Sequence, residues 1–207
     1  IEAFKNGEDV HRRTAAEVFG MQPENITPEQ RRYAKTINFG LIYGMSSYGL
    51  AKSLGIDNAS ADMFIKRYFA RYTGVADYMQ RTKDQAADLG YVETLFGRRL
   101  YLPDIHAKNA QARAGAERAA INAPMQGTAS DLIKRAMIAV DNFLRLGSLK
   151  TRLTMQVHDE LVLEVPKSEQ ERIVQNIPAL MASVGKGVLG VPLVAEVGIG
   201  KNWDDAH

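Results

Sequence analysis

Helical patterns come first in this chain and most strand patterns come last. An Ala-rich helical stretch spans about residues 108–146, where Pro124 is expected to kink or break the helix because proline lacks a backbone donor. Helices followed by strands mixed with further helices favour an α+β fold over a repeated βαβ architecture. The sequence also predicts helices over about 9–19, 28–43, 60–73, 74–90 and 168–184, β-hairpins over 91–102 and 153–165, and a further strand over 191–197.

Composition places the chain among ordinary globular proteins and excludes several classes of site. Of its 207 residues, 45% are hydrophobic and 24% are charged, which argues against wholesale disorder. The absence of cysteine excludes disulfide scaffolds, thiolate zinc sites and cysteine nucleophiles. No apolar run approaches the roughly 18 residues that a membrane span requires. A net charge of +2 neither demands nor forbids a polyanionic partner, so the placement of the charges has to decide.

The helix predicted over about 28–43 has a well-marked start. Thr27 suits the N-cap, Pro28 the first helical position, and Gln30 the third position, as in a capping box. Gly44 follows Tyr43 and loosens the backbone where the helix is expected to end. We therefore expect a helix with well-defined ends in this part of the chain.

Two cations and two aromatic residues recur along this helix at intervals of four: Arg31, Lys35, Phe39 and Tyr43. Each lies only about 40° around the helix from the previous one, so the four form one stripe. Cations near a helix N-terminus suit a phosphate chain, and the aromatics suit a base or sugar. Spacing alone favours the simpler interpretation, in which an amphipathic helix directs its aromatics into the core.

A second candidate site is the turn between the two strands of 153–165. Asp159 and Glu160 are adjacent there, and carboxylates at a hairpin tip can bind a hard cation such as Mg²⁺. The alternative is a solvated acidic turn, because aspartate is common in turns. Two-metal phosphoryl transfer usually needs further carboxylates from elsewhere in a fold.

A third candidate is a polar face on the Ala-rich helix. Arg118, Asn122 and Gln126 step by four and share one face, and such side chains suit phosphate, sugar or base-edge contacts. Taken alone, this pattern is more typical of a solvated helix face.

Together these pieces resemble the family A DNA polymerases. The resemblance rests on Arg31-x3-Lys35-x3-Phe39-x3-Tyr43-Gly44, on Val157-His158-Asp159-Glu160, and on Arg118-x3-Asn122-Ala123-Pro124-Met125-Gln126-Gly127. It also includes the segment from Gly97 to Pro103. The resemblance implies a fingers subdomain over residues 1–106, with the nucleotide-binding helix at about 28–43. It implies the C-terminal part of a palm over 107–207, with a carboxylate hairpin at about 151–165.

The same resemblance implies a role for each candidate residue. Arg31, Lys35 and His11 would bind the incoming deoxynucleoside triphosphate, and Lys35 would also donate a proton to the leaving pyrophosphate. Phe39 would pack near the sugar, and Tyr43 would lie at the growing base pair. Asp159 would bind the catalytic Mg²⁺ ions, supported by Glu160. Arg118, Asn122, Gln126 and His158 would contact primer-template DNA.

The family's other carboxylate motif would precede Ile1, as would the thumb. We therefore expect a fragment of a DNA-templated DNA polymerase that supplies half of the two-metal site and does not polymerise alone. Its expected partners are primer-template DNA, deoxynucleoside triphosphates and the N-terminal part of the same polymerase, with no membrane. The resemblance implies a cytoplasmic, nucleoid-associated location. The alternatives are a non-catalytic nucleic-acid-binding fragment and a piece of a related single-subunit RNA polymerase.

Overall fold

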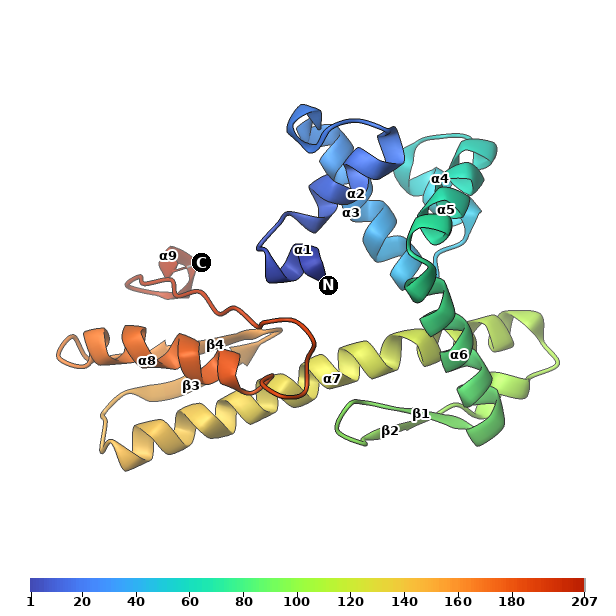
Figure 1. The fold of residues 1–207 in the computed structure, drawn as a ribbon. Helices are drawn as coiled ribbons and strands as arrows, with labels where there is room; N and C mark the ends of the chain where they lie inside the picture. The colour runs from blue at the N-terminus through green and yellow to red at the C-terminus, as the bar shows by residue number, and fades with distance from the viewer. Residues whose placement is uncertain (207) are drawn as a thin grey trace. The chain divides into compact units, whose positions relative to one another are not determined.

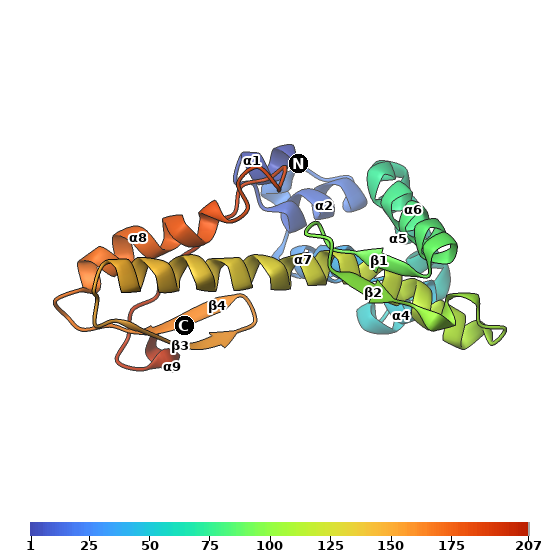
Figure 2. The same cartoon turned by 90° about the horizontal axis from the view of Figure 1, so that it is seen from below.

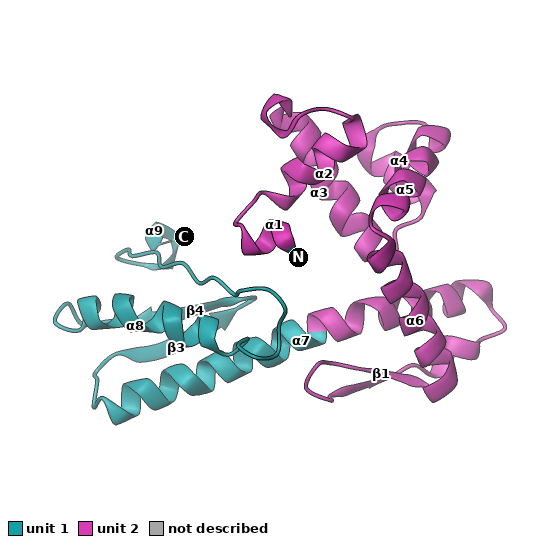
Figure 3. Ribbon diagram, in the orientation of Figure 1, with its two compact units in different colours: residues 1, 127–207 teal, residues 2–126 magenta. Residues whose placement is uncertain are grey.

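A computed structural model describes residues 1–206 and divides the chain into two compact units (Figure 3). One unit comprises residues 2–126, and the other comprises residues 127–207 with Ile1. The division falls inside helix α7 (Ala110–Leu146). Both units combine helices with a single two-stranded antiparallel sheet, which confirms the predicted α+β class. The functional division into fingers and palm near residue 106 stays a prediction.

The unit of residues 2–126 is mainly helical (Figure 1). A helix that the sequence did not predict, α4, forms shortly after Gly44. The elements before α7 are α1 (Glu2–Lys5), α2 (Val10–Phe19), η1 (Pro23–Asn25), α3 (Pro28–Ile42), α4 (Ser47–Leu54), α5 (Asn58–Arg71), α6 (Thr73–Leu89), β1 (Tyr91–Glu93), β2 (Arg99–Tyr101) and η2 (Pro103–His106).

The core of this unit gathers around one face of α3. Ile37 and Leu41 are almost completely buried there, and they pack with Leu50 of α4 and Tyr68 of α5. A separate cluster joins α6, β1 and the start of α7 through small and branched side chains, including Ala86, Val92, Ala116 and Ala120. The rotation of α3 about its axis is thus fixed by what it buries.

The hairpin of β1 and β2 confirms the prediction for this segment, although its strands are shorter than expected. Tyr91 pairs with Tyr101 and Glu93 with Arg99 across the antiparallel ladder. Arg99 Nε lies 2.7 Å from Glu93 Oε1, and its guanidinium carbon lies 4.4 Å from the centre of the Tyr91 ring.

Helix α7 continues through Pro124 without interruption, so of the kink or break expected there, the break is wrong (Figure 2). Proline inside a helix removes one hydrogen bond and costs about 3 kcal/mol. Buried residues on both sides of the proline hold the helix, among them Ala120 and Ile121 before it and Ala136 and Val140 after it. Burial at these positions offsets the local defect.

The unit of residues 127–207 is built from the second part of α7, β3 (Arg152–Val157), β4 (Glu160–Glu164), α8 (Gln170–Ser183) and α9 (Trp203–Ala206). Val140 and Leu144 of α7 pack with Ile173 and Ile177 of α8, against partly buried residues of β4. The two strands are antiparallel, with an irregularity in register between Leu153 and Met155. None of the described helices is long and apolar enough to cross a membrane.

The loop before β3 is held by the carboxylate of Glu169, which was not identified from the sequence. Glu169 accepts hydrogen bonds from the backbone of Lys150 and Thr151 and from the Thr151 hydroxyl, at 2.7–2.9 Å. These bonds, from the Lys150 backbone above all, hold the pKa of Glu169 below its ordinary value. The loop is therefore fixed to the beginning of α8.

The further strand expected over 191–197 is wrong, because the structure assigns no strand to these residues. A strand is defined by backbone pairing, and the sheet described in this unit contains β3 and β4 alone. Pro192 also lacks a backbone donor. Val194 is 81% exposed, and none of the residues 191–197 is fully buried.

The capping box at the start of α3 is present as predicted. Thr27 accepts from the Gln30 backbone at 3.2 Å, and the Gln30 side chain accepts from the Thr27 backbone at 2.9 Å. We expect Thr27→Ala to lower the free energy of unfolding by about 1 kcal/mol, because one helix donor loses its partner. Thr27→Ser retains the oxygen and should stay within a few tenths of a kcal/mol of the parent. Urea denaturation measures both, and equal stability of the two variants would contradict the role of the cap.

Candidate nucleotide-binding site and carboxylate hairpin

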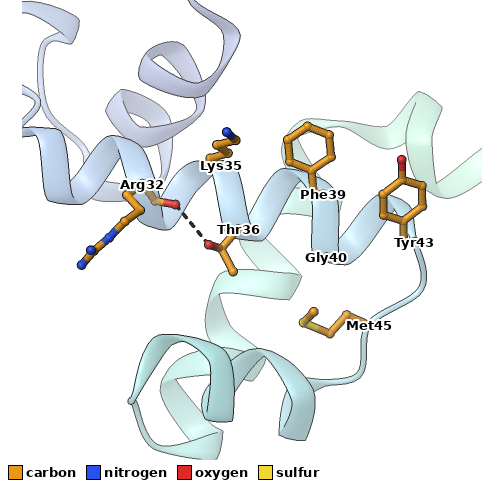
Figure 4. Close-up of a pocket in the computed structure, with 7 residues that line it drawn as sticks. All are labelled: Arg32, Lys35, Thr36, Phe39, Gly40, Tyr43 and Met45. Carbon is orange, nitrogen blue, oxygen red and sulfur yellow. Dashed lines mark hydrogen bonds between the residues drawn. The ribbon is translucent and has the colours of Figure 1, made fainter. Parts of the chain in front are cut away.

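The polar face of α3 carries the first group of candidate residues. Lys35, Phe39 and Tyr43 project from the same side of the helix (Figure 4). Phe39 is 46% exposed and Tyr43 is 39% exposed, so the expectation that these aromatics enter the core is wrong. Together with Arg32, Thr36, Gly40 and Met45, they line an open pocket of about 540 Å³.

The aromatic residues continue in a row onto α2. The Phe39 and Tyr43 ring centres lie 6.3 Å apart, with the rings nearly parallel at 18°. The His11 ring centre lies 5.5 Å from that of Phe39, and the two rings are tilted by 48°. This row presents exposed ring surface beside the ammonium group of Lys35, an arrangement suited to a flat ring and an anion in one ligand.

Arg31 lies at the cationic end of the stripe and is held by Asp9. The Nε atom of Arg31 lies 2.6 Å from Asp9 Oδ2, while Asp9 Oδ1 accepts from the backbone of His11 and Arg12 and caps α2. Partial burial opposes ionisation of Asp9, but the hydrogen bonds from Arg31 and from the α2 backbone outweigh it, so its pKa lies below its ordinary value. The sequence did not identify Asp9 as the partner of Arg31.

His11 lies beside both cations of the stripe. Desolvation lowers the pKa of His11, and the charges of Arg31 and Lys35 lower it further against the opposing effect of Asp9. The imidazole is therefore neutral near pH 7, and its Nδ1 lies 3.1 Å from Nδ2 of Asn38. Asn38 was not identified from the sequence, since a polar residue in a helix has no distinctive spacing signal.

The polar face of α7 lies partly beside the end of α3. Gly44 ends that helix with a φ of 74°, and a Cβ at this position would lie 3.1 Å from Cγ of Arg118. Glycine is thus required here for its conformation and for the close approach of Arg118. Arg118 and Gln126 are exposed, whereas Oδ1 of Asn122 is buried without a hydrogen-bond partner in the part of the chain that the structure describes.

The carboxylate hairpin forms the second group. Its two-residue turn consists of His158 and Asp159, and His158 adopts a φ of 52°, which is unfavourable for a residue with a side chain. Gln156 Nε2 donates to the His158 carbonyl at 2.5 Å and so supports the turn. Asp159 is exposed, while Glu160 accepts a 3.3 Å hydrogen bond from Nε1 of Trp203. Trp203 was not identified from the sequence.

The hairpin does not by itself provide a complete metal centre. Carboxylate oxygens are suitable ligands for Mg²⁺, but that ion prefers six oxygen ligands. No cluster of three acidic or histidine side chains that could hold a metal ion occurs among residues 1–206. The donors of this chain therefore do not fit a two-metal centre without additional ligands.

The structure thus brings His11, Arg31, Lys35, Phe39 and Tyr43 together around α2 and α3, with Arg118 near the end of α3. His158, Asp159 and Glu160 belong to the other compact unit. The first group has the features of an anion-and-ring site, and the second is an acidic hairpin.

The chain therefore combines an α+β fold with a helix of exposed cations and aromatics and with an acidic hairpin. The chain belongs to DNA polymerase family A, whose family model matches residues 1–205. It is 59% identical over its whole length to DNA polymerase I of Pseudomonas aeruginosa. It is 47% identical to that of Geobacillus stearothermophilus over 206 residues.

A solved structure is similar over nearly the whole chain. The POL domain of Pol1 from M. smegmatis, in complex with DNA primer-template and dNTP, aligns with 99% of this chain at a TM-score of 0.94 and 45% identity. This chain covers 36% of that domain chain. It spans 22% of the Pseudomonas relative and 23% of the Geobacillus relative.

The pair of Asp9 and Arg31 predicts a pH-dependent contribution to stability. Because the pKa of Asp9 is below its ordinary value of 3.8 in the folded chain, its contribution is complete above that value and is lost as pH falls through the lowered pKa. Asp9→Asn keeps a capping oxygen but removes the charge. We expect it to be less stable at pH 7 by a few tenths of a kcal/mol, given solvent screening, with the difference disappearing in acid. Thermal unfolding across pH measures this, and a constant difference would contradict it.

The strained turn predicts that two small substitutions at His158 will differ in stability. His158→Gly and His158→Ala both remove the imidazole, but only glycine accepts a positive φ without a steric penalty. We expect the glycine variant to be more stable than the alanine variant by about 1 kcal/mol in urea denaturation. If the alanine variant were equally stable, the turn would not carry the strain inferred from its backbone.

Proposed function

We propose that this chain is part of a DNA-templated DNA polymerase that adds deoxynucleotides to a primer 3′ end. The observation that carries the proposal is the exposed row of cations and aromatics on α3 and α2, in a member of DNA polymerase family A. Exposed Phe39 and Tyr43 leave apolar ring surface in water, which favours a ligand that covers them.

The cationic end of the row would bind the triphosphate. Arg31 is held through Nε, which leaves its two Nη groups available for phosphate oxygens, and Lys35 adds an exposed ammonium. Charge-assisted hydrogen bonds to phosphate are stronger than neutral ones. Charge builds on the pyrophosphate as it leaves, so Lys35 would stabilise it and donate a proton to it.

The aromatic end would position the sugar and base. Phe39 contacts both the His11 ring and the Tyr43 ring, so a nucleotide with phosphates near His11 and Lys35 would place its sugar near Phe39. Tyr43 follows at the helix end and would meet the growing base pair. Arg118, Asn122, Gln126 and His158 would contact the primer-template DNA.

Asp159 would be a ligand of catalytic Mg²⁺, with Glu160 in a supporting role. Because this chain offers one adjacent carboxylate pair, we propose that the remaining ligands come from a further segment of polymerase chain. The proposed partners are that segment, primer-template DNA and deoxynucleoside triphosphates, with a cytoplasmic location at the nucleoid. The match to DNA polymerases over residues 1–205 favours this function over an RNA polymerase.

A chimaera tests the function directly. We would replace the matching 22% of the Pseudomonas aeruginosa polymerase with this chain and measure primer extension with four deoxynucleotides. The expected result is template-directed extension that Asp159→Ala abolishes. Failure of a folded chimaera to extend a primer would contradict the proposed function and would favour a non-catalytic nucleic-acid-binding role.

In the same chimaera, we expect Lys35→Ala to lower kcat/KM for the deoxynucleotide by about 10²-fold, because an electrostatic stabiliser of the leaving group is lost. The affinity for primer-template DNA should change far less. Lys52→Ala removes another exposed lysine, on α4, and serves as the matched control. Equal losses of nucleotide use and DNA binding in Lys35→Ala would contradict the role assigned to this residue.

A further inference from the structure

A partly buried amide connects α3 to α2 behind the proposed triphosphate site. Nδ2 of Asn38 lies 3.1 Å from Nδ1 of His11 and 3.0 Å from Oγ1 of Thr14. An amide nitrogen has two protons and no lone pair to accept with, so it can serve both neighbours only as a donor.

The hydroxyl of Thr14 lies within reach of both polar atoms of this amide, and the nitrogen is the nearer of the two. Thr14 is only 3% exposed, and its hydroxyl donates to the Val10 carbonyl at 2.8 Å. Its single proton is used in that bond, although Oδ1 of Asn38 also lies within 3.2 Å. Oγ1 can then only accept, from Asn38 Nδ2 at 3.0 Å and from the Tyr72 hydroxyl at 3.4 Å. The amide nitrogen therefore donates to Thr14, and the same nitrogen lies 3.1 Å from Nδ1 of His11.

We propose that Asn38 is a positioning residue that holds the His11 ring with Nδ1 as an acceptor and its proton on Nε2. Nε2 lies across the ring from Asn38, so a triphosphate would meet a hydrogen-bond donor there. This proposal rests on the proposed function for the identity of the ligand, but the state of the ring itself does not depend on it.

The charges around His11 make the position of the proton important. Arg31 and Lys35 disfavour the imidazolium, whereas Asp9 favours it, and the balance together with desolvation leaves a neutral ring. A neutral imidazole has one donor and one acceptor, so its tautomer decides whether phosphate oxygens meet an N–H or a lone pair. Packing of Phe39 against the ring, at 5.5 Å between centres, further limits its rotation.

The first experiment observes the ring without any nucleotide. ¹⁵N NMR of the ring nitrogens of the 207-residue chain, at a pH where His11 is neutral, should show an unprotonated Nδ1 and a protonated Nε2. Exposed His158 provides a reference for a ring that averages its tautomers. His11→Ala assigns the signals. A protonated Nδ1 in the unmodified chain would overturn the proposal.

Three conservative substitutions then separate positioning from folding. Asn38→Asp replaces the donating nitrogen with an acceptor oxygen, so Nδ1 of His11 should become protonated. Thr14→Val should move the His11 signals toward the averaged reference, whereas Thr14→Ser keeps the hydroxyl and should leave them unchanged. If Asn38→Asp folds but leaves Nδ1 unprotonated, Asn38 does not set the state of the ring.

The last experiment connects the ring to the ligand through a double-mutant cycle. Asn38→Leu should weaken binding of dATP and of tripolyphosphate to the chain by about three- to tenfold. It should have no further effect in a His11→Ala background. An equal loss in both backgrounds would mean that Asn38 acts on the fold, and would overturn the proposal. If the ring state is as proposed but neither probe binds the unmodified chain, the proposed function fails and the positioning of His11 stands.

Discussion

The burial of one face of α3 is the interaction on which the candidate nucleotide site depends. Ala34, Ile37 and Leu41 face the core, and this fixes the rotation of the helix about its own axis. A rotation by one residue, about 100°, would exchange buried positions for exposed ones. Because the core contacts exclude that rotation, Phe39 and Tyr43 remain at the surface. The capping box at Thr27 and the left-handed Gly44 define the two ends of the helix.

The polar contacts around α2 add orientation to this exposure. Asp9 caps α2 with one carboxylate oxygen and holds Arg31 with the other, so the start of one helix positions a side chain of the next. Thr14 and Asn38 occupy the partly buried space behind His11. Buried polar groups are costly without partners, so a satisfied network favours one arrangement of α2 against α3. The same contacts that pack α2 against α3 therefore also orient the charge of Arg31 and the ring of His11 in the proposed phosphate site.

The acidic hairpin depends on a different balance. Its strands contain no buried hydrophobic residue, and the core beside them comes from α7 and α8. Glu169 fixes the loop before β3, and Gln156 supports the turn in which His158 adopts its strained backbone. Strained positions often coincide with functional sites. The outcome is an exposed Asp159 on a turn with defined geometry, although the described residues add no third ligand for a metal.

The sequence by itself determined the α+β class, the capped helix over 28–43, both hairpins and the four-residue spacing of the stripe, because capping, periodicity and turn chemistry act locally. Local signals did not decide the outcome at Pro124 or over 191–197. The continuity of the helix at Pro124 depends on burial before and after the proline. A strand over 191–197 would depend on backbone pairing with another strand. Only the tertiary structure showed that Phe39 and Tyr43 are exposed, that Asp9 holds Arg31, and that Asn38 meets His11. These contacts join residues 22 to 28 positions apart, and no local pattern specifies which face of a helix a neighbouring helix will bury.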